Sequence, residues 1–341
     1  MKKKIDVAII GGGVSGMEAA SMLLRLGLHV VLIEEKEKLG GHVGQWDRLF
    51  PDGRHANELL KPIYDALVGV DIYLSATVVG VEREQNRYVL TLSEGTILDA
   101  GAVLLATGFS LFDAQRKEEY GYGIYNRAIT SADLEQSFIE GKGLGAMSKN
   151  PLRVGFVHCV GSRDEKVCNR HCSKVCCATA VKQAGELKEL HPNARIYCFY
   201  MDLRMFGRYY EDMYLQAQNK YGIQFIRGRV SEVSEDIEGN LVAKAEDTLA
   251  GQPLRVTLDY LILMSGMERH EHAPQIAELF NVFFAEDCFF QTCDAHNSSL
   301  SSNQPGLFFA GACIGPKTYT DSINEARSAA VTIYKYLRQL L

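Results

Sequence analysis

The feature that most limits what this chain can fold into is a glycine-rich turn near its N-terminus, Gly11-Gly12-Gly13-Val14-Ser15-Gly16. The turn follows a short apolar segment, residues 4–10, and precedes a segment rich in Ala, Met and Leu, residues 16–26. Its first, third and sixth residues satisfy the pattern G-x-G-x-x-G. In that pattern the glycines permit a tight turn, close approach of the backbone to a pyrophosphate, and close packing of a helix on a strand. The turn therefore predicts a β-strand, a phosphate-binding loop and a helix whose N-terminus faces the phosphates.

An acidic residue follows this turn at a distance suited to ribose recognition. Residues 29–34 form a second apolar segment, and it ends in Glu34, 18 residues after Gly16. A carboxylate at this place can bind the ribose hydroxyl groups, and it disfavours a 2′-phosphate by charge repulsion. Because strand, helix and strand follow one another, this part of the chain also predicts a parallel sheet.

Three further elements resemble those of two-dinucleotide-binding flavoproteins. Those proteins carry a glycine pair after the ribose acid, an A-T-G element after a buried strand, and a C-terminal strand that ends in A-G near the flavin. This chain has Gly40-Gly41, then Ala106-Thr107-Gly108, then GLFFAG at residues 306–311. The resemblance implies bound FAD and an α/β fold of the thioredoxin reductase type, with two Rossmann-like domains, the second inserted in the first. The residues that we expect to bind FAD are Gly11, Gly13, Val14, Ser15, Gly16, Glu34, Gly40, Gly41, Val79, Ala106, Thr107, Gly108, Gly311, Ala312, Lys317, Ser322 and Ile323.

One position departs from the pattern of those flavoproteins. Many of them have an Asp after the A-G pair, which bonds the ribityl chain, and Ala312 stands in its place here. The ribityl contacts must therefore differ. Lys317 either supplies positive charge near the flavin or is a solvated surface lysine, and the sequence leaves both alternatives open.

The order of the expected elements divides the chain into domains. Apolar residues make up 47% of the 341 residues, which is ample for buried cores. We expect an FAD-binding domain from residues 1–120 and 275–341, an inserted module at 150–270, and a linker at 121–149, where glycines and an Asn-Pro pair interrupt the alternation. Further strands are expected at residues 75–82, 88–92, 102–105, 153–157, 195–199, 224–229, 258–264 and 307–310, and helices at 176–190 and from 321 to the C-terminus.

Charge and hydropathy exclude two classes of partner. A net charge of −6 gives no basic footprint for nucleic acid. No apolar run approaches the roughly 18–20 residues that a membrane span needs. The lysine-rich start is not followed by the long apolar run and cleavage site of a signal peptide. We therefore expect a soluble, cytoplasmic protein.

Five of the nine cysteines lie between residues 159 and 177, directly after the strand expected at 153–157. A two-dinucleotide-binding flavoprotein would have its second G-x-G-x-x-G there, for NAD(P)H, and that pattern is absent. Because cytosolic proteins seldom use disulfides as staples, the group indicates metal or redox chemistry. Zinc sites and redox disulfides favour C-x-x-C pairs, which this segment lacks. An iron–sulfur cluster needs four converging thiolates, which a helix start with Arg163 and Lys174 nearby would favour.

Several segments resemble the A subunit of heterodisulfide reductases, and together they extend over nearly the whole chain. They are HCVGSRD at residues 158–164, CSKVCC at 172–177, YMDLRMFG at 200–207, IRGRVS at 226–231, EDTL at 246–249 and AGACIGPK at 310–317. The resemblance implies a [4Fe-4S] cluster beside FAD, with Cys159, Cys172, Cys176 and Cys177 as its ligands and Cys168 outside the shared pattern. It also implies that Lys182, five residues after the cysteine pair, lies near the flavin as a catalytic residue. A lysine on the helix surface is the alternative.

The chain also departs from the methanogen type of that family. Residues 50–56 lack the cysteines expected there for another cluster, and no C-x-x-C-x-x-C insert occurs. The chain thus resembles the short heterodisulfide reductase-like A subunit of sulfur-oxidising prokaryotes. That resemblance implies sulfane-sulfur oxidation, partners similar to the B and C subunits and a homodimer, and it argues against electron bifurcation.

Two alternatives for the function belong to other classes. A stand-alone pyridine-nucleotide disulfide reductase would use a cysteine pair, and the missing second glycine pattern counts against it. A non-catalytic FAD and zinc scaffold is disfavoured by the cysteine spacing.

Overall fold

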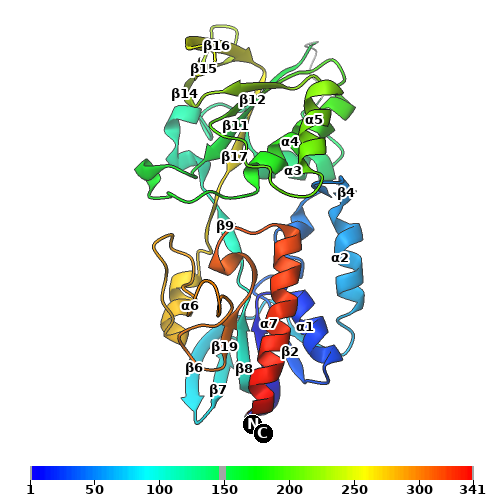
Figure 1. Ribbon diagram of the computed structural model, residues 1–341, viewed down its shortest axis with the longest axis vertical. Coiled ribbons are helices and arrows are strands. Elements are labelled where there is room, and N and C mark those ends of the chain that lie inside the picture. Colours follow the sequence, from blue (N-terminus) through cyan, green and yellow to red (C-terminus); the bar gives the residue numbers. More distant parts are fainter. Residues whose placement is uncertain (1, 146–150, 340–341) are drawn as a thin grey trace. The chain divides into compact units, whose positions relative to one another are not determined.

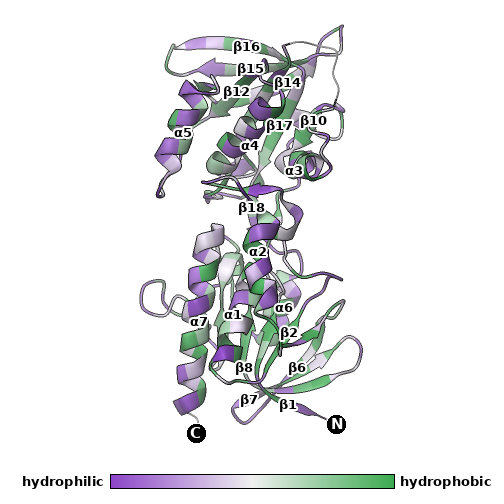
Figure 2. Ribbon diagram, turned by 90° about the vertical axis from the view of Figure 1, so that its right-hand side faces the viewer, coloured by the Kyte–Doolittle hydropathy of each residue, from purple (hydrophilic) through white to green (hydrophobic). Residues whose placement is uncertain are grey.

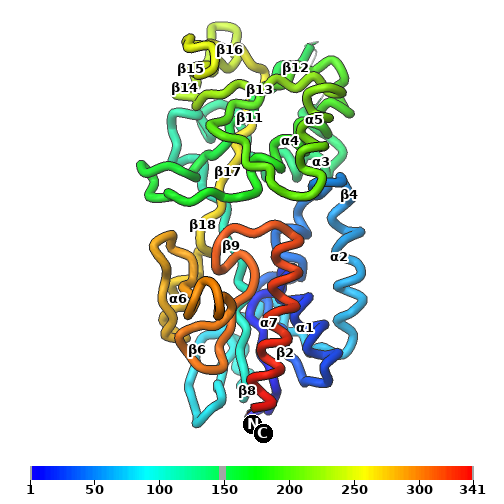
Figure 3. The backbone as a smooth tube through the Cα atoms, in the orientation of Figure 1, coloured from blue at the N-terminus to red at the C-terminus, as the bar shows by residue number. Residues whose placement is uncertain are grey.

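The computed structural model describes residues 2–145 and 151–339 and divides the α/β chain into two compact units (Figure 1). Unit 1 consists of Met1–Gln45, Asn57–Ser110 and Glu268–Leu341, and unit 2 consists of Trp46–Ala56 and Leu111–Met267. The units divide the chain differently from the domains expected from the sequence, because Trp46–Ala56 and residues 111–120 belong to unit 2. The path of the chain through each unit can be followed in Figure 3.

Unit 1 is built on a seven-stranded sheet. Its strands are β1 (Lys3–Ile10), β2 (Val30–Ile33), β5 (Asp71–Tyr73), β6 (Val78–Glu84), β7 (Arg87–Leu92), β8 (Ile97–Leu105) and β19 (Leu307–Phe309). The order is β5-β2-β1-β8-β7-β6, and β19 lies beside the end of β8. Strands β5, β2, β1, β8 and β19 run parallel, and β7 and β6 extend the sheet as an antiparallel hairpin. Segments from the start, middle and end of the chain therefore lie side by side (Figure 1).

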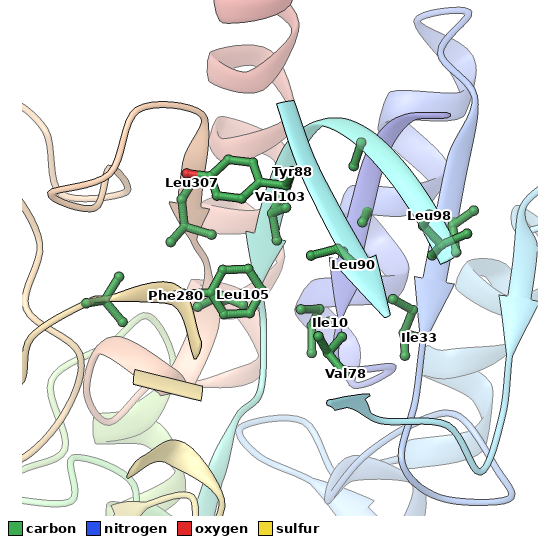
Figure 4. Packing of buried hydrophobic residues seen from close by; sticks show 14 of the residues in the cluster. Ile10, Ile33, Val78, Tyr88, Leu90, Leu98, Val103, Leu105, Phe280 and Leu307 are labelled. Carbon is green, nitrogen blue, oxygen red and sulfur yellow. The ribbon is translucent and has the colours of Figure 1, made fainter. Parts of the chain in front are cut away.

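The two faces of this sheet are covered by different elements. Alternate side chains of the strands, such as Ile10, Ile33 and Leu105, share one core with Phe280 of helix α6 (Ala273–Phe280), as Figure 4 shows. Helices α1 (Val14–Arg25) and α7 (Tyr319–Gln339) pack against each other and against β1, β2 and β8. Figure 2 shows hydrophobic and hydrophilic stretches alternating along α7, as expected of a helix with one buried face.

Unit 2 contains a five-stranded parallel sheet in the order β10-β17-β11-β12-β13. These strands are β10 (Ala128–Thr130), β11 (Arg153–Val160), β12 (Arg195–Tyr200), β13 (Gln224–Arg227) and β17 (Tyr260–Ser265). A separate antiparallel sheet is formed by β14 (Val230–Glu235), β15 (Leu241–Asp247) and β16 (Gln252–Leu258). Further elements of the described residues are β3 (Arg48–Leu49), β4 (Arg54–His55), α2 (Ala56–Asp65), β9 (Phe109–Leu111) and β18 (Met267–Arg269).

The parallel sheet of unit 2 has a core on each face. Helices α3 (Ser131–Ile139), α4 (Cys176–Leu190) and α5 (Tyr210–Asn219) share one core with Phe156 and Ile262 of the sheet. The antiparallel sheet shares the other core with Val157 and Leu263, the next residues along the same two strands. The two-residue period of the strands thus separates the cores.

Most of the expected elements are confirmed, with shifts of a few residues at their ends. The helix expected at 176–190 is α4, and the apolar stripe of the last helix is buried at Ile323, Ala326, Ala330 and Ile333. The small antiparallel sheet and helices α2, α3, α5 and α6 were not expected.

The prediction of a linker at residues 121–149 is wrong for the part of this range that the structure describes. Residues 121–145 contain β10 and α3, which belong to unit 2, and residues 146–149 lie outside the described part of the chain. Helix α3 has only nine residues and begins with a capping box between Thr130 and Asp133. Its apolar stripe is short and is flanked by glycines. The glycines therefore led to the prediction of a linker in place of a helix.

Candidate functional site

The glycine-rich turn of unit 1 closes where β1, β8 and α1 come together. A Cβ on Gly11, whose φ is +108°, would lie 2.3 Å from the carbonyl oxygen of Ala106, directly after β8. A Cβ on Gly16 would lie 1.8 Å from the carbonyl oxygen of Gly11. Only glycine fits at these two positions, because no side chain can approach backbone so closely. The start of α1 therefore lies at the carboxyl ends of the parallel strands, the place where α/β sheets bind ligands.

Glu34, the expected ribose acid, lies against this turn. It is 7% exposed, and its carboxylate accepts hydrogen bonds from the backbone N–H groups of Gly12 at 2.5 Å and Lys36 at 2.9 Å. The glycine pair lies there as well, because the Gly40 N–H donates to the Gly12 carbonyl oxygen at 2.8 Å. A Cβ on Gly41 would lie 3.1 Å from Cα of Gly13. Turn, acid and glycine pair thus form one cluster of residues.

The C-terminal segment brings further expected residues to the same turn. A Cβ on Gly311 would lie 2.2 Å from Oγ of Ser15, and this hydroxyl donates to the Ser322 carbonyl oxygen at 3.3 Å. Thr107 follows Ala106, and its Oγ1 is buried without a hydrogen-bond partner among the described residues. A buried hydroxyl without a partner is uncommon in proteins, so this atom is a polar group that a bound ligand can satisfy.

Lys317 has a partner that the sequence analysis missed. Its Nζ lies 2.6 Å from the carboxylate of Glu325, and its side chain is 20% exposed. Glu325 also accepts the Gly311 N–H at 3.1 Å. The alternative of a freely solvated Lys317 is therefore wrong. Glu325 was missed because an acid on a terminal helix has the pattern of a solvated surface residue.

The remaining expected FAD contacts differ in burial. Val14 and Ile323 are buried at the first turns of α1 and α7, Gly108 follows Thr107, and Ala312 is partly buried. Val79 on β6 is 56% exposed. Its strand starts near Glu34, because the N–H of Ala76 donates to the Glu34 carbonyl oxygen at 3.0 Å. Glycine turn, buried acid and unsatisfied hydroxyl together fit a dinucleotide such as FAD.

The cysteines of unit 2 lie in the connection between β11 and α4. Cys159 is at the end of β11 with a φ of +60°, and Cys176 and Cys177 start α4. These three side chains are at most 4% exposed, and none of the nine cysteines is in a disulfide.

Three of these thiols interact with one another. The Cys176 thiol hydrogen-bonds both Cys159 and Cys177. This interaction lowers the pKa of the Cys159 thiol, lowers that of Cys177 and raises that of Cys176 itself. Cys177 also donates to the carbonyl oxygen of Asp202, with the sulfur 3.7 Å away. The first turn of α4 thus gathers three buried sulfur atoms.

Cys172 lies in the same connection between β11 and α4 and is only partly buried. Its sulfur accepts the Lys174 N–H at 3.4 Å. Burial lowers the pKa of the Arg163 guanidinium, but a hydrogen bond with Asp202 and the charges of Cys159 and Cys172 raise it overall. Arg163 is therefore close to both thiols.

Thiol donors of this kind suit an iron–sulfur group. Within residues 2–145 and 151–339, no three or more His, Cys, Asp or Glu side chains have the geometry of a metal site. The donor set nevertheless fits an iron–sulfur cluster in its chemistry. Three hydrogen-bonded thiols lie at the start of α4 and a fourth lies near Arg163, and a helix N-terminus and a guanidinium group both favour thiolates. Cys168, by contrast, is exposed.

Lys182 is buried on α4 and is not a surface lysine. It is 8% exposed, and its ammonium donates to the carbonyl oxygen of Arg48 at 2.9 Å and to the carboxylate of Glu135. Glu186 lies one helical turn further on, with Oε2 3.4 Å from the Lys182 nitrogen. Both acids were missed in the sequence, although the spacing of four residues from Lys182 to Glu186 is a signal that could have revealed one of them.

Comparison with solved structures identifies the fold. The fold resembles thioredoxin reductases from T. acidophilum (TM-score 0.66, 16% identity, 98% of this chain and 99% of that one) and Lactococcus lactis (TM-score 0.66, 17% identity, 98% and 99%). Residues 1–129 match the pyridine nucleotide-disulphide oxidoreductase family. The chain thus has the fold of two-dinucleotide-binding flavoproteins.

Sequence relatives narrow the class to one family. The chain is 31% identical to the second CoB–CoM heterodisulfide reductase iron-sulfur A subunit of Methanopyrus kandleri, over 96% of this chain and 64% of the relative. It is 29% identical to the corresponding A subunit of Methanocaldococcus jannaschii, over 95% of this chain and 63% of the relative. The chain is thus similar to heterodisulfide reductase A subunits over nearly its whole length.

The chain spans just under two thirds of the length of these relatives. The alignment with the M. kandleri protein extends over 421 positions, although this chain has 341 residues. The relative therefore has segments inside the aligned region that this chain lacks. None of the helices in the described ranges is long and apolar enough to span a membrane.

Proposed function

We propose that this chain is an oxidoreductase subunit that binds FAD in unit 1 and a [4Fe-4S] cluster in unit 2, and that it transfers electrons within a heterodisulfide reductase-like complex. The observation that carries the proposal is the position of the thiols, with Cys159 at the end of β11 and Cys176 and Cys177 at the start of α4. In the two-dinucleotide-binding fold, the strand-to-helix connection at this place in the second domain would bind a nicotinamide cofactor.

The residues of unit 1 support FAD as the dinucleotide. Gly11 and Gly16 let the backbone and the start of α1 approach a pyrophosphate, and Glu34 is buried where a ribose would bind. Lys317 and Glu325, which pair with each other, replace the missing Asp as the charged groups near Gly311.

The residues of unit 2 that would hold the cluster are Cys159, Cys172, Cys176 and Cys177. When bound, FAD supplies two-electron chemistry and the cluster passes single electrons. The chain itself sets the surroundings of both groups. The N-terminus of α4 and Arg163 stabilise negative charge on the thiolates, and burial limits solvent access. Lys182 is the residue that we assign a catalytic role next to the flavin.

The partners and the pathway are proposals as well. The relatives are A subunits of heterodisulfide reductases, so we infer partners similar to the B and C subunits. The internal segments that this chain lacks favour the short form found in sulfur oxidisers, and thus sulfane-sulfur oxidation. The homodimer and the cytoplasmic location stay predictions.

Iron and acid-labile sulfide analysis of anaerobically purified protein tests the cluster. We expect about four iron and four sulfide per chain, together with bound FAD. Cys172→Ala should remove the iron and the brown absorbance while FAD stays bound. Cys168→Ala is the matched control, because Cys168 is exposed and outside the proposed ligand set, and it should retain both.

Other results would contradict the proposal. Zinc in place of iron, or a yellow protein without metal, would rule out the cluster. Rapid bleaching of the flavin by NADH alone would favour the stand-alone disulfide reductase instead. Loss of FAD together with iron in Cys172→Ala would show that the two sites are not separable.

A further inference from the structure

A buried cluster of ionisable side chains in unit 2 surrounds Lys182. Glu135 comes from α3, Lys182 and Glu186 come from α4, and Arg48 comes from the short segment Trp46–Ala56. The side chains of Glu135, Lys182 and Glu186 are 4%, 6% and 9% exposed. Two carboxyl groups and one ammonium group thus share a site with little access to water.

The two carboxyl groups have very different surroundings. Glu135 accepts hydrogen bonds from Lys182, from the Gln183 amide at 2.7 Å and from the Asp47 backbone N–H at 3.0 Å. Glu186 accepts none from the described residues, although both of its oxygens are buried. Its charged neighbours are the Lys182 nitrogen at 3.4 Å and Arg48 Nε at 4.0 Å. Hydrogen bonds stabilise a carboxylate and burial without them destabilises it, so these surroundings favour a proton on Glu186.

The wider set of charges leads to the same assignment. Arg48 also contacts Asp47 at 3.7 Å and Glu189 at 3.1 Å, so its charge is shared among several acids. With the carboxyl groups of Asp47, Glu135, Glu186 and Glu189 all ionised and His55, which lies 3.0 Å from Asp47, neutral, the four acids would face the two cations Lys182 and Arg48. A proton on Glu186 halves this excess of negative charge.

We propose that Glu186 holds a proton at neutral pH and exchanges it with Lys182, so that the pair acts as a proton donor in unit 2. In the exchange, Lys182 gives one proton to an acceptor, the O–H bond of Glu186 breaks, and an N–H bond forms on Lys182. Glu186 is left as a carboxylate, and the pair has released one proton in all. Reduction of a flavin takes up protons as well as electrons, so naming FAD as the acceptor rests on the function proposed above.

The electrostatic surroundings of Glu186 favour such an exchange. The pKa of its carboxyl group is raised to about 7, chiefly by burial. The charge of Glu135 also raises this pKa, whereas the charges of Lys182 and Arg48 lower it. A group that titrates near neutral pH can both hold and release a proton under physiological conditions.

The full-length protein labelled with ¹³C at the glutamate carboxyl carbons tests the proposal by NMR titration. We expect one carboxyl signal with a midpoint near pH 7, lost in Glu186→Gln and retained in Glu189→Gln. Glu189 is the matched control, because it lies on the same helix, also contacts Arg48 and is 49% exposed. In protein labelled at lysine Cε, the Lys182 signal should shift at the same pH in the native sequence and not in Glu186→Gln.

Two further variants test the coupling within the cluster. Glu135→Gln removes a negative neighbour and should move the midpoint of Glu186 to lower pH, whereas Lys182→Gln should move it to higher pH. The proposal is overturned if no glutamate signal titrates above pH 6, if the signal persists in Glu186→Gln, or if the midpoint is the same in Glu135→Gln.

The role of FAD is tested separately. With flavin bound, the pH dependence of its midpoint potential should change slope near pH 7 in the native sequence and not in Glu186→Gln. An unchanged slope in both would overturn delivery to the flavin. Absence of FAD from the purified protein would overturn the proposed function, while the NMR titration would still decide whether Glu186 holds a proton.

Discussion

Strands β1 and β11 each lie inside a parallel sheet beside the strand that follows their helix, so the strand-to-helix connections after them can be compared directly. In unit 1, β1 and α1 are separated by the three glycines at residues 11–13. In unit 2, β11 and α4 are separated by residues 161–175, and thiols lie at both ends of this connection. The two connections thus occupy corresponding places in their sheets but contain different residues, glycines in unit 1 and cysteines in unit 2.

The difference follows from what each connection must bring together. A dinucleotide is bound largely by backbone N–H groups, which requires glycine where the backbone approaches the ligand closely. A cluster is bound by side chains, which requires thiols that converge from separate parts of the connection. Buried polar side chains stabilise the longer connection, above all Asp164, which accepts from Lys117 at 2.8 Å.

A large effect on FAD binding is expected for Gly16→Ala in the short connection. The added Cβ would lie 1.8 Å from the Gly11 carbonyl oxygen, so the turn must shift, at a cost of about 1–3 kcal/mol. We expect FAD binding to be weakened roughly tenfold or more, as measured by the FAD content of the purified protein. Gly44→Ala is the control, because a Cβ there meets nothing closer than 3.8 Å. Full FAD content in Gly16→Ala would contradict the proposed mode of binding.

The long connection should respond to the loss of its buried acid. Asp164 is 3% exposed, and Asp164→Asn leaves Lys117 buried with a weaker set of acceptors. We expect the free energy of unfolding to fall by about 3 kcal/mol, measured by denaturant titration. Asp202→Asn breaks an ion pair whose Asp is 49% exposed, and it should lower this free energy by less than about 1 kcal/mol. Equal effects of both variants would show that Asp164 does not stabilise the connection.

Helix α4, which follows the long connection, should make stability depend on pH. The pKa of Glu186 is about 7 in the folded chain, above the ordinary 4.5, so the folded state binds the proton more tightly. The free energy of unfolding should therefore fall as the pH rises from 4.5 to 7, by about 3 kcal/mol from this group. Glu186→Gln should remove this part of the pH dependence and Glu189→Gln should retain it, as measured by denaturant titration at several pH values. A curve unchanged in Glu186→Gln would contradict the assignment.

A smaller effect is expected at the C-terminal part of the FAD site. Glu325→Gln weakens the ion pair with Lys317 and the hydrogen bond to Gly311. Because the pair is partly exposed, we expect a loss of about 1 kcal/mol and thus less than tenfold weaker FAD binding, measured by flavin titration of the apoprotein. Glu84→Gln breaks an exposed pair elsewhere in unit 1 and should leave FAD affinity unchanged.

The sequence by itself determined the features that depend on local geometry and on long regular patterns. The glycine turn, the acid at the end of the second strand and helix α4 could all be read from spacing, because each depends on residues close together in the chain. The small antiparallel sheet and α3 could not, because their stripes are short and their burial depends on packing against the parallel sheet.

Only the tertiary structure decided which distant residues share a site. It places Gly311 against Ser15, and it buries Lys182 against Glu135 of another helix. The sequence held the residue types but not their partners, because the partners come from segments up to 296 positions apart that only sheet pairing and helix packing bring together. The same packing buries Glu186, and because burial disfavours the charged form, the pKa of its carboxyl group is raised to near neutral pH.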